Sequence, residues 1–278
     1  MLKNKYTNEK IAKTVIWSAA LFVLFVLSAI IVYLLYKGLP QINLDFLTQI
    51  PRDGGASGGI LSPIVGTLMV TAVAVVIAIP FGIGTAFYLA EYTREGIFTR
   101  IIRFSADALA GIPSIVYGLF GYIFFVSIMG LGLSILSGGL TLAFMILPTL
   151  IRTAEEAIKA VPKAYRETSF SLGATKWQTI KNAVFPSALR GIVNGVILSV
   201  GRCIAETAAV ILTAGSVLNM PTGLDSSTRT MAAHFYLVAS EGISMEKAFG
   251  TAALLIILIF FINIVANALV NKLVAKGH

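Results

Sequence analysis

Six long apolar stretches alternate with polar segments along the chain. Several of them reach the roughly 20 residues that a helix needs to cross the hydrocarbon core of a bilayer. This pattern predicts an all-α polytopic membrane protein with six transmembrane helices. We expect the helices at about 12–36, 62–91, 104–130, 140–160, 187–214 and 248–271.

The polar segments divide the chain into three parts. Residues 1–61 hold the first helix and an external loop, residues 62–271 form a core of five helices, and residues 272–278 form a short basic tail. The first apolar stretch is too long for the apolar region of a secretion signal, so we interpret it as an uncleaved membrane helix. Three of the predicted helices contain a proline that is a candidate bend point: Pro80, Pro113 and Pro148.

Basic residues are unevenly distributed between the polar segments, which we expect at 37–61, 91–103, 130–139 (a glycine-rich turn), 161–186 and 215–247. With six helices, both termini share a side with 91–103 and 161–186. That side carries 13 Lys and Arg, against four on the opposite side. Because positively charged loops stay in the cytoplasm, we expect both termini and the 161–186 segment there. The formal net charge of +8 therefore belongs to the loops and is no signal for nucleic-acid binding.

The polar segment 161–186 has a sequence pattern typical of ordered structure. Pro162 suits the first turn of a short helix, which we expect to run over 163–172 with Gly173 just after its end. Thr175 and Gln178 have the spacing of a capping box that starts a second short helix, which we expect Pro186 to limit. An ordinary amphipathic connector is the alternative interpretation of this segment taken alone.

The same segment resembles the EAA loop of ABC-importer permeases, in which Glu-Ala-Ala is followed by a glycine and then by Ile-x-Leu-Pro. Glu167, Gly173 and Pro186 fall at the matching spacing, whereas positions 168, 169, 183 and 185 differ from the pattern. In that family the loop is the coupling helix that enters a cleft of the ATPase subunit. The resemblance therefore implies ATPase-coupling residues Glu167, Gly173, Ala174, Trp177 and Pro186. The indole of Trp177 equally suits a membrane-interface anchor.

Further segments resemble the permeases of ABC phosphate importers: ILSPIVGT at 60–67, IPFGIG at 79–84, YLAEY at 88–92 and IPSIVYGLF at 112–120. The resemblance covers most of the chain from about residue 54 onward and is weakest in 217–247. It implies a type I ABC importer permease (MetI-like) fold, with a cytoplasmic coupling helix between the fourth and fifth transmembrane helices.

Two pairs of opposite charges lie within predicted transmembrane helices: Arg152 with Glu155, and Arg202 with Glu206. Charges inside a bilayer are costly and therefore face a water-filled path or a partner. The spacings of three and four residues place each pair on one helical face, where it can neutralise itself until an oxyanion competes for the guanidinium. Structural salt bridges between helices are the alternative. The resembled permeases carry similar Arg-Thr-x-Glu and Arg…Glu-Thr segments, which favours a substrate pathway lined by these four residues.

Composition narrows the possible functions. The chain is 57% hydrophobic and 12% charged, with a mean hydropathy of +0.88. One cysteine, Cys203, excludes an internal disulfide, and two histidines are too few for a His-rich metal site. We expect Cys203 to be a small buried apolar residue, His234 to be a surface residue of an external helical segment, and Asp107 to be a solvated or capping charge. The sequence has no GxxxxGK[ST] loop, so we expect no cofactor on this chain and ATP bound by a partner subunit.

Together these features predict a permease subunit, not itself an enzyme, of an ATP-driven importer of inorganic phosphate in a bacterial or archaeal plasma membrane. By resemblance it would pair with a second, related permease, two ATPase subunits at 161–186, and an extracytoplasmic phosphate-binding protein at 37–61 and 215–247. The alternatives are the same fold importing another oxyanion (sulfate, molybdate or tungstate), an ion-coupled secondary carrier, and a membrane scaffold that transports nothing.

Overall fold

The computed structural model describes residues 2–94 and 96–275, which are mostly helical. Five of the described helical stretches are long and apolar enough to cross a membrane, and a bent pair of shorter helices makes a sixth. The all-helical, polytopic prediction is therefore confirmed. The long helices are α1 (Leu2–Gly38), α3 (Leu61–Phe87), α6 (Ile135–Lys159), α9 (Phe185–Ala205) and α12 (Met245–Ala275).

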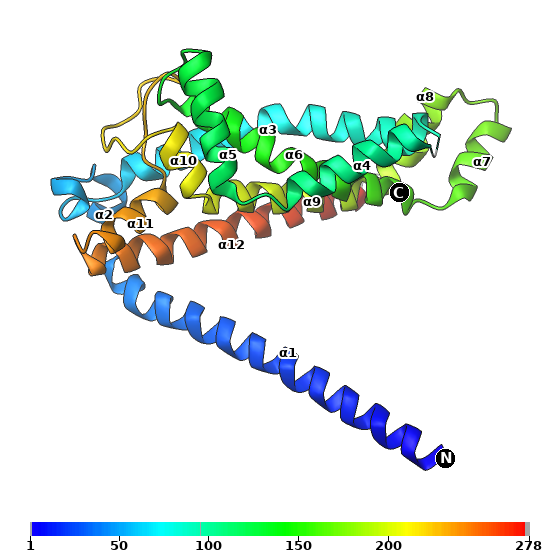
Figure 1. Ribbon diagram of the computed structural model, residues 1–278, viewed down its shortest axis with the longest axis horizontal. Coiled ribbons are helices and arrows are strands. Elements are labelled where there is room, and N and C mark those ends of the chain that lie inside the picture. The colour runs from blue at the N-terminus through cyan, green and yellow to red at the C-terminus, as the bar shows by residue number, and fades with distance from the viewer. Residues whose placement is uncertain (1, 95, 276–278) are drawn as a thin grey trace.

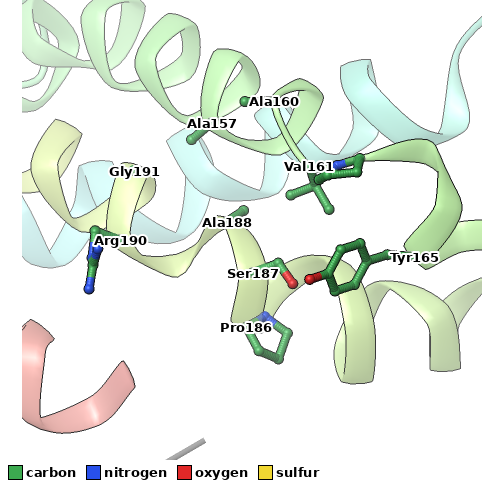
Figure 2. Close-up of a pocket in the computed structure, with 10 residues that line it drawn as sticks. Ala157, Ala160, Val161, Tyr165, Pro186, Ser187, Ala188, Arg190 and Gly191 are labelled. Carbon is green, nitrogen blue, oxygen red and sulfur yellow. The ribbon is translucent and has the colours of Figure 1, made fainter. Parts of the chain in front are cut away.

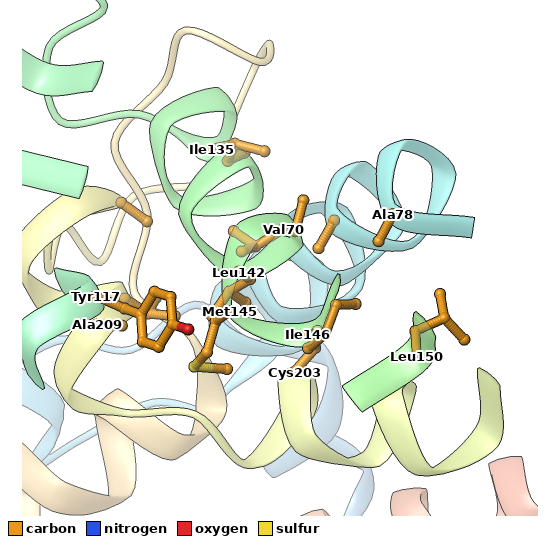
Figure 3. Packing of buried hydrophobic residues seen from close by; sticks show 14 residues of the cluster. Val70, Ala78, Tyr117, Ile135, Leu142, Met145, Ile146, Leu150, Cys203 and Ala209 are labelled. Carbon is orange, nitrogen blue, oxygen red and sulfur yellow. The ribbon is translucent and has the colours of Figure 1, made fainter. Parts of the chain in front are cut away.

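The centre of the bundle is the contact between α3 and α6, which is the most extensive contact between two elements (Figure 1). Small residues permit it: a side chain added at Gly139 would collide with Val73, and one added at Gly82 would collide with Leu150. The main apolar core forms around this contact, and Figure 3 shows α6 side chains such as Leu142 and Ile146 at its middle. Cys203 joins this core as a buried apolar residue, as expected.

Helix α1 stands apart from the bundle along most of its length (Figure 1). No residue in its apolar window is buried. It meets α12 only toward its C-terminal end, where the Tyr33 and Phe249 rings pack edge to face and Gly38 lies against the backbone of Phe249. The side chains of α1 are therefore left for lipid or for another subunit to cover.

The prediction of a single helix at 104–130 is wrong. The structure has α4 (Ile97–Ala110) and α5 (Ser114–Gly121), which continues into the π-helix η4 (Tyr122–Ile128), and the two parts meet at 99°. Pro113 explains the break, because it has no N–H to donate and disfavours helical geometry at the residue before it. Pro80 and Pro148, by contrast, lie inside helices that continue past them.

A second break was not expected. Helix α9 ends at Ala205, Glu206 is extended (φ −73°, ψ 132°), and the chain resumes helix as α10 (Ala208–Thr213), so the continuous helix predicted at 187–214 is also wrong. The helix that follows the first break, α5, packs beside α10, because Gly118 lies directly against Ala209. Two interrupted helices therefore face one another inside the bundle.

The glycine-rich turn expected at 130–139 is shorter than predicted, because α6 already begins at Ile135, with Ser134 accepting a hydrogen bond from the backbone N–H of Ser137. The glycines of this stretch have two roles. Gly130 and Gly132 adopt positive φ angles in the turn, whereas Gly138 lies inside α6, where a side chain would collide with Ala214.

One end of the bundle carries short elements: η1 (Leu39–Gln41), α2 (Leu44–Thr48), η2 (Asp53–Gly55) and α11 (Met231–Ser240). His234 of α11 is 1% exposed and lies beneath Gly55, so the expectation of a surface histidine is wrong. Burial, with a smaller contribution from the charge of Arg229, lowers the pKa of His234 from 6.5 to about 4. The histidine is therefore neutral at physiological pH.

Candidate functional site: the polar segment and the buried charges

The segment 161–186 folds as two short helices followed by a long one. α7 (Lys163–Ser171) ends before Gly173, which has the positive φ of +80° expected after a helix C-terminus, and α8 (Lys176–Thr179) begins with the predicted capping box of Thr175 and Gln178. Figure 1 shows α7 and α8 projecting from the end of the bundle opposite α2 and α11. Order in a projecting polar segment is consistent with a surface built to meet a partner.

Pro186 does not limit the second helix, contrary to expectation. From α8 the chain continues through the π-helix η5 (Ile180–Val184) directly into α9, giving one helical stretch from Lys176 to Ala205. Pro186 lies in the first turn of α9, and its ring is compatible there because it follows a change of helix type. α8, η5 and α9 therefore form one continuous helical rod.

Arg166 is the main tie between α7 and the bundle, and the sequence analysis missed it. Its Nε and Nη2 donate to Oε1 of Glu91, at 3.0 and 2.7 Å, at the end of the π-helix η3 (Tyr88–Tyr92) that extends α3. Its Nη1 and Nη2 also donate to the carbonyls of Val161 and Ile158, at 2.8 and 2.9 Å. One guanidinium therefore joins α7 to the ends of both α3 and α6. A signal existed, because Glu91 is the only charged residue in the apolar stretch predicted at 62–91.

The remaining packing of α7 is sparse. None of its residues is buried, and an open hollow of about 590 Å³ separates it from α6 and the start of α9. Figure 2 shows Tyr165 of α7 and Ser187 of α9 pointing toward one another across this hollow. A second, smaller tie is the 2.8 Å hydrogen bond between the hydroxyls of Ser169 and Thr179. The segment is held by a few directed polar contacts rather than by a core.

The expected pairing of Arg152 with Glu155 is wrong. Arg152 instead bonds Asp107 of α4 at 2.8 Å and approaches Glu156 at 3.8 Å. Asp107 is half exposed, so it is a solvated charge as expected, and it is also the ion-pair partner of Arg152. The three-residue spacing did bring Arg152 and Glu155 to neighbouring sides of α6, but α4 supplies a separate partner to each of them.

Glu155 faces the interior, where it is 1% exposed. Its Oε1 accepts from Arg103 at 2.7 Å and from Lys159 at 2.8 Å. The pair of Lys159 with Glu155 joins positions one turn apart on α6, so it is a structural ion pair within that helix. The side chain of Arg152 is 34% exposed. Of Arg152 and Glu155, only Arg152 is therefore partly exposed.

Arg202 and Glu206 are also not paired. Arg202 lies at the level of the middle of α6, where its Nη1 is 3.5 Å from the hydroxyl of Thr149. Glu206 turns away at the helix break and accepts from the backbone N–H of Ala209 at 3.4 Å, capping α10. No ion pair within 2–94 and 96–275 joins Arg202 to a carboxylate. The break removes Glu206 from the i+4 geometry on which the predicted pair depended.

Arg152 and Arg202 are both partly exposed, and Arg152 lies three residues after Thr149, the α6 residue that Arg202 contacts. Arg202 itself lies just before the helix break at Glu206. Broken helices and intramembrane charges recur together at the solute sites of transporters. A guanidinium with free donors can bind an oxyanion through two parallel hydrogen bonds. Among the described side chains, no group of three or more His, Cys, Asp or Glu is placed to hold a metal ion.

A comparison with protein families matches residues 78–276 to the binding-protein-dependent transport system inner membrane component family. The chain belongs to this family. The match begins within α3 and includes the broken helices, the buried charges and the 161–186 segment. The protein is therefore an inner membrane component of a transport system that depends on a binding protein.

Curated relatives extend the match over the whole chain. The probable ABC transporter permease protein YqgI of Bacillus subtilis is 31% identical over 98% of both chains. The phosphate transport system permease protein PstA of Xylella fastidiosa (strain Temecula1) is 39% identical over 77% of this chain and 75% of its own. PstA of Pasteurella multocida is 33% identical over 94% and 93%. This membership accounts for a polytopic chain that carries no ATP-binding loop of its own.

Solved structures share the fold at low sequence identity. A bacterial importer of the acidic polysaccharide alginate aligns over 97% of this chain and 98% of its own with a TM-score of 0.65 at 15% identity. The inward-facing methionine transporter MetNI aligns over 77% and 95% with a TM-score of 0.63 at 20% identity. These likenesses confirm the expected MetI-like permease fold.

Proposed function

We propose that the chain is the membrane-spanning permease subunit of an ATP-driven importer of inorganic phosphate. The observation that carries the proposal is the relatedness to phosphate-system permeases at 33–39% identity, which in one case extends over 94% of the chain. Two partly exposed arginines beside a helix break supply the chemistry that a small oxyanion needs. The core, residues 62–271, forms half of the pathway, and residues 1–61 and 272–278 flank it.

The proposed orientation follows the distribution of charge. Figure 1 shows the start of α1, the end of α12 and the α7–α8 region toward one end of the long axis, and the polar segments at that end carry the excess of Lys and Arg. We assign this end to the cytoplasm. The opposite end, with the 37–61 and 215–247 segments, then faces the outside and receives the extracytoplasmic phosphate-binding protein. A second, related permease covers the open face of the bundle and completes the pathway.

The proposed ATPase contact is the tip of the α7–α8 region, where Glu167, Gly173 and Ala174 lie on or beside the exposed turn. Closure of an ATPase pair on ATP binding would push this region as a unit. Arg166 would carry the movement to Glu91 at the end of α3, and the continuous α8–η5–α9 rod would carry it to Arg202. The predicted coupling residue Pro186 lies within this rod, in the first turn of α9.

In the proposed pathway the anion meets Arg202 first in the middle of the bundle and then Arg152 toward the cytoplasm. Arg202 has no carboxylate partner within the described parts of the chain, so its donors are open to the anion, whereas Arg152 must exchange Asp107 for it. Glu206 holds the start of α10 in place and offers an acceptor to a protonated phosphate oxygen. Glu155 acts indirectly, by fixing Arg103 and Lys159 around α6.

Reconstituted uptake tests this function. The chain, its partner permease, the ATPase pair and the binding protein are assembled in vesicles, and uptake of radiolabelled phosphate is measured with excess sulfate, molybdate or tungstate. We expect ATP-dependent uptake that only phosphate and its close analogue arsenate suppress. Suppression by sulfate or by molybdate and tungstate would assign another oxyanion, and uptake with a hydrolysis-defective ATPase would assign an ion-coupled carrier.

A further inference from the structure

An open groove of about 510 Å³ runs between the end of α3 and the start of the α8–η5–α9 rod. Ile83, Phe87 and Phe185 form its apolar floor, with the two phenylalanine rings 6.0 Å apart. Its rim is aromatic: Tyr88 and Tyr92 stand on one side. Trp177, 64% exposed, stands on the other.

The charged side chains around this groove are lysines and therefore positive. Lys181 lines it, and the ammonium of Lys176 lies 4.9 Å above the ring of Tyr92 at its rim. No Asp or Glu lines it, and Glu91, next to the rim in sequence, is occupied by Arg166. A ligand that complements the apolar floor and the basic rim of this groove has a long apolar part and an anionic end.

The groove lies where two candidate membrane spans end, Leu61–Tyr92 on one wall and Lys176–Ala205 on the other. Tyrosine, tryptophan and lysine together at the end of a span are typical of the level of the lipid headgroups. Both walls are π-helical at this point, through η3 and η5, and π-helical turns occur frequently at functional sites. The groove is therefore formed by two local irregularities of otherwise regular helices.

We propose that this groove binds an anionic phospholipid of the inner leaflet, with an acyl chain along Phe87 and Phe185 and its headgroup phosphate at Lys176 and Lys181. Trp177 is then a membrane-interface anchor rather than an ATPase contact. Because Lys176 and Trp177 belong to α8, the bound lipid would hold this part of the proposed coupling region against the membrane. The inference concerns lipid binding and does not depend on which anion is transported.

Gly84 provides a direct way to close the groove. It lines the groove, and a Cβ added there would meet no atom of a neighbouring element within 4 Å. Gly84→Leu therefore extends an apolar side chain into the groove from a position where the Cβ is free of contacts, and it replaces a poor helix former inside α3. Val76→Leu, at an exposed position of the same helix, is the matched control for added bulk.

Tryptophan fluorescence can report which lipid lies in the groove, because Trp177 lines it. The chain has two tryptophans, and replacing the exposed Trp17 of α1 by phenylalanine leaves Trp177 as the only emitter. The full-length Trp17→Phe chain is placed in phosphatidylcholine vesicles containing a small fraction of brominated phosphatidylglycerol or brominated phosphatidylcholine. Bromine quenches only at contact distance, so stronger quenching by the anionic lipid measures its enrichment beside Trp177.

We expect brominated phosphatidylglycerol to quench Trp177 preferentially. Each lysine near an anionic lipid contributes about a fivefold preference, so Lys176→Gln and Lys181→Gln should each lower the enrichment by about that factor. Gly84→Leu should abolish it. Lys163→Gln, which removes an exposed lysine of α7 outside the groove, and Val76→Leu should leave it unchanged.

Three results would overturn the proposal. Equal quenching by the two lipids would show that the groove has no preference for an anionic headgroup. No quenching by either would show that protein, not lipid, covers Trp177. A preference that survives Gly84→Leu would place the anionic lipid outside the groove.

Discussion

Replacing Arg166 by lysine should release α7 from the bundle. The substitution keeps the positive charge, so a single ionic contact to Glu91 can survive. A lysine cannot reproduce the planar fork that bonds Glu91 twice while also reaching the carbonyls of Val161 and Ile158. At least two of the four hydrogen bonds are lost.

The cost follows from these contacts. A hydrogen bond involving a charged group contributes about 1.5–3 kcal/mol when buried. The Arg166 side chain is 19% exposed, so water recovers part of what the two lost bonds contribute. A net loss of about 2 kcal/mol corresponds to a roughly 30-fold larger opening constant for α7. Because no residue of α7 is buried, other contacts offer little compensation.

Hydrogen–deuterium exchange measures this opening constant residue by residue. In Arg166→Lys we expect the amides of α7 to exchange about 30-fold faster, while those in the middle of α6 stay unchanged. Arg190→Lys is the matched control, because Arg190 is an exposed arginine of α9 on the other side of the hollow. Unchanged exchange in α7 would refute the role assigned to Arg166, and acceleration throughout the bundle would mean that the substitution destabilises the whole fold instead.

Four further substitutions test other parts of the account. Gly173→Ala forces a side chain into a positive φ and should destabilise the α7–α8 turn by about 1 kcal/mol, seen as faster exchange there. Glu155→Gln should lower the free energy of unfolding by about 3 kcal/mol, because it removes the charge of a buried carboxylate that accepts hydrogen bonds from Arg103 and Lys159. Asp107→Asn, at a half-exposed pair, should cost under about 1 kcal/mol, and equal losses in denaturation would be inconsistent with this difference in burial. His234 stays neutral in the folded protein down to a pKa of about 4 but takes up a proton near pH 6.5 once unfolded. Unfolding is therefore favoured progressively as pH falls from 6.5 to 4, by up to about 3 kcal/mol, and thermal unfolding of His234→Gln should lack this dependence.

Local signals predicted much of the fold. The apolar stretches located the helices expected at 62–91, 140–160 and 248–271 to within about five residues, since span length is set by bilayer thickness and depends little on neighbours. The bounds of α7 and the start of α8 were predicted closely, because Gly173 and the capping box of Thr175 and Gln178 act within a few positions of the chain. The expected end of the second helix at Pro186 was wrong. Family resemblance supplied the rest of the architecture and the proposed partners.

Long-range contacts could not be predicted in the same way. The break at Glu206 has no proline or glycine beside it, so nothing local distinguishes it from the helix that precedes it. The partner of Glu155 on α4, Arg103, is 52 residues away, and that of Arg166 is 75 residues away. Helical spacing correctly placed the charges on α6, but the neighbouring helices decided which charges pair.

Arg202 gives the most direct test of the central claim, that an intramembrane guanidinium beside the broken helices carries the anion. Arg202→Gln keeps a hydrogen-bond donor and similar length but removes the charge, and Arg190→Gln removes a charge from the exposed part of the same helix. In vesicles containing the full transporter, the account predicts that Arg202→Gln lowers ATP-dependent phosphate uptake at least about tenfold while Arg190→Gln transports normally. Normal uptake in Arg202→Gln, with the transporter correctly assembled, would contradict it.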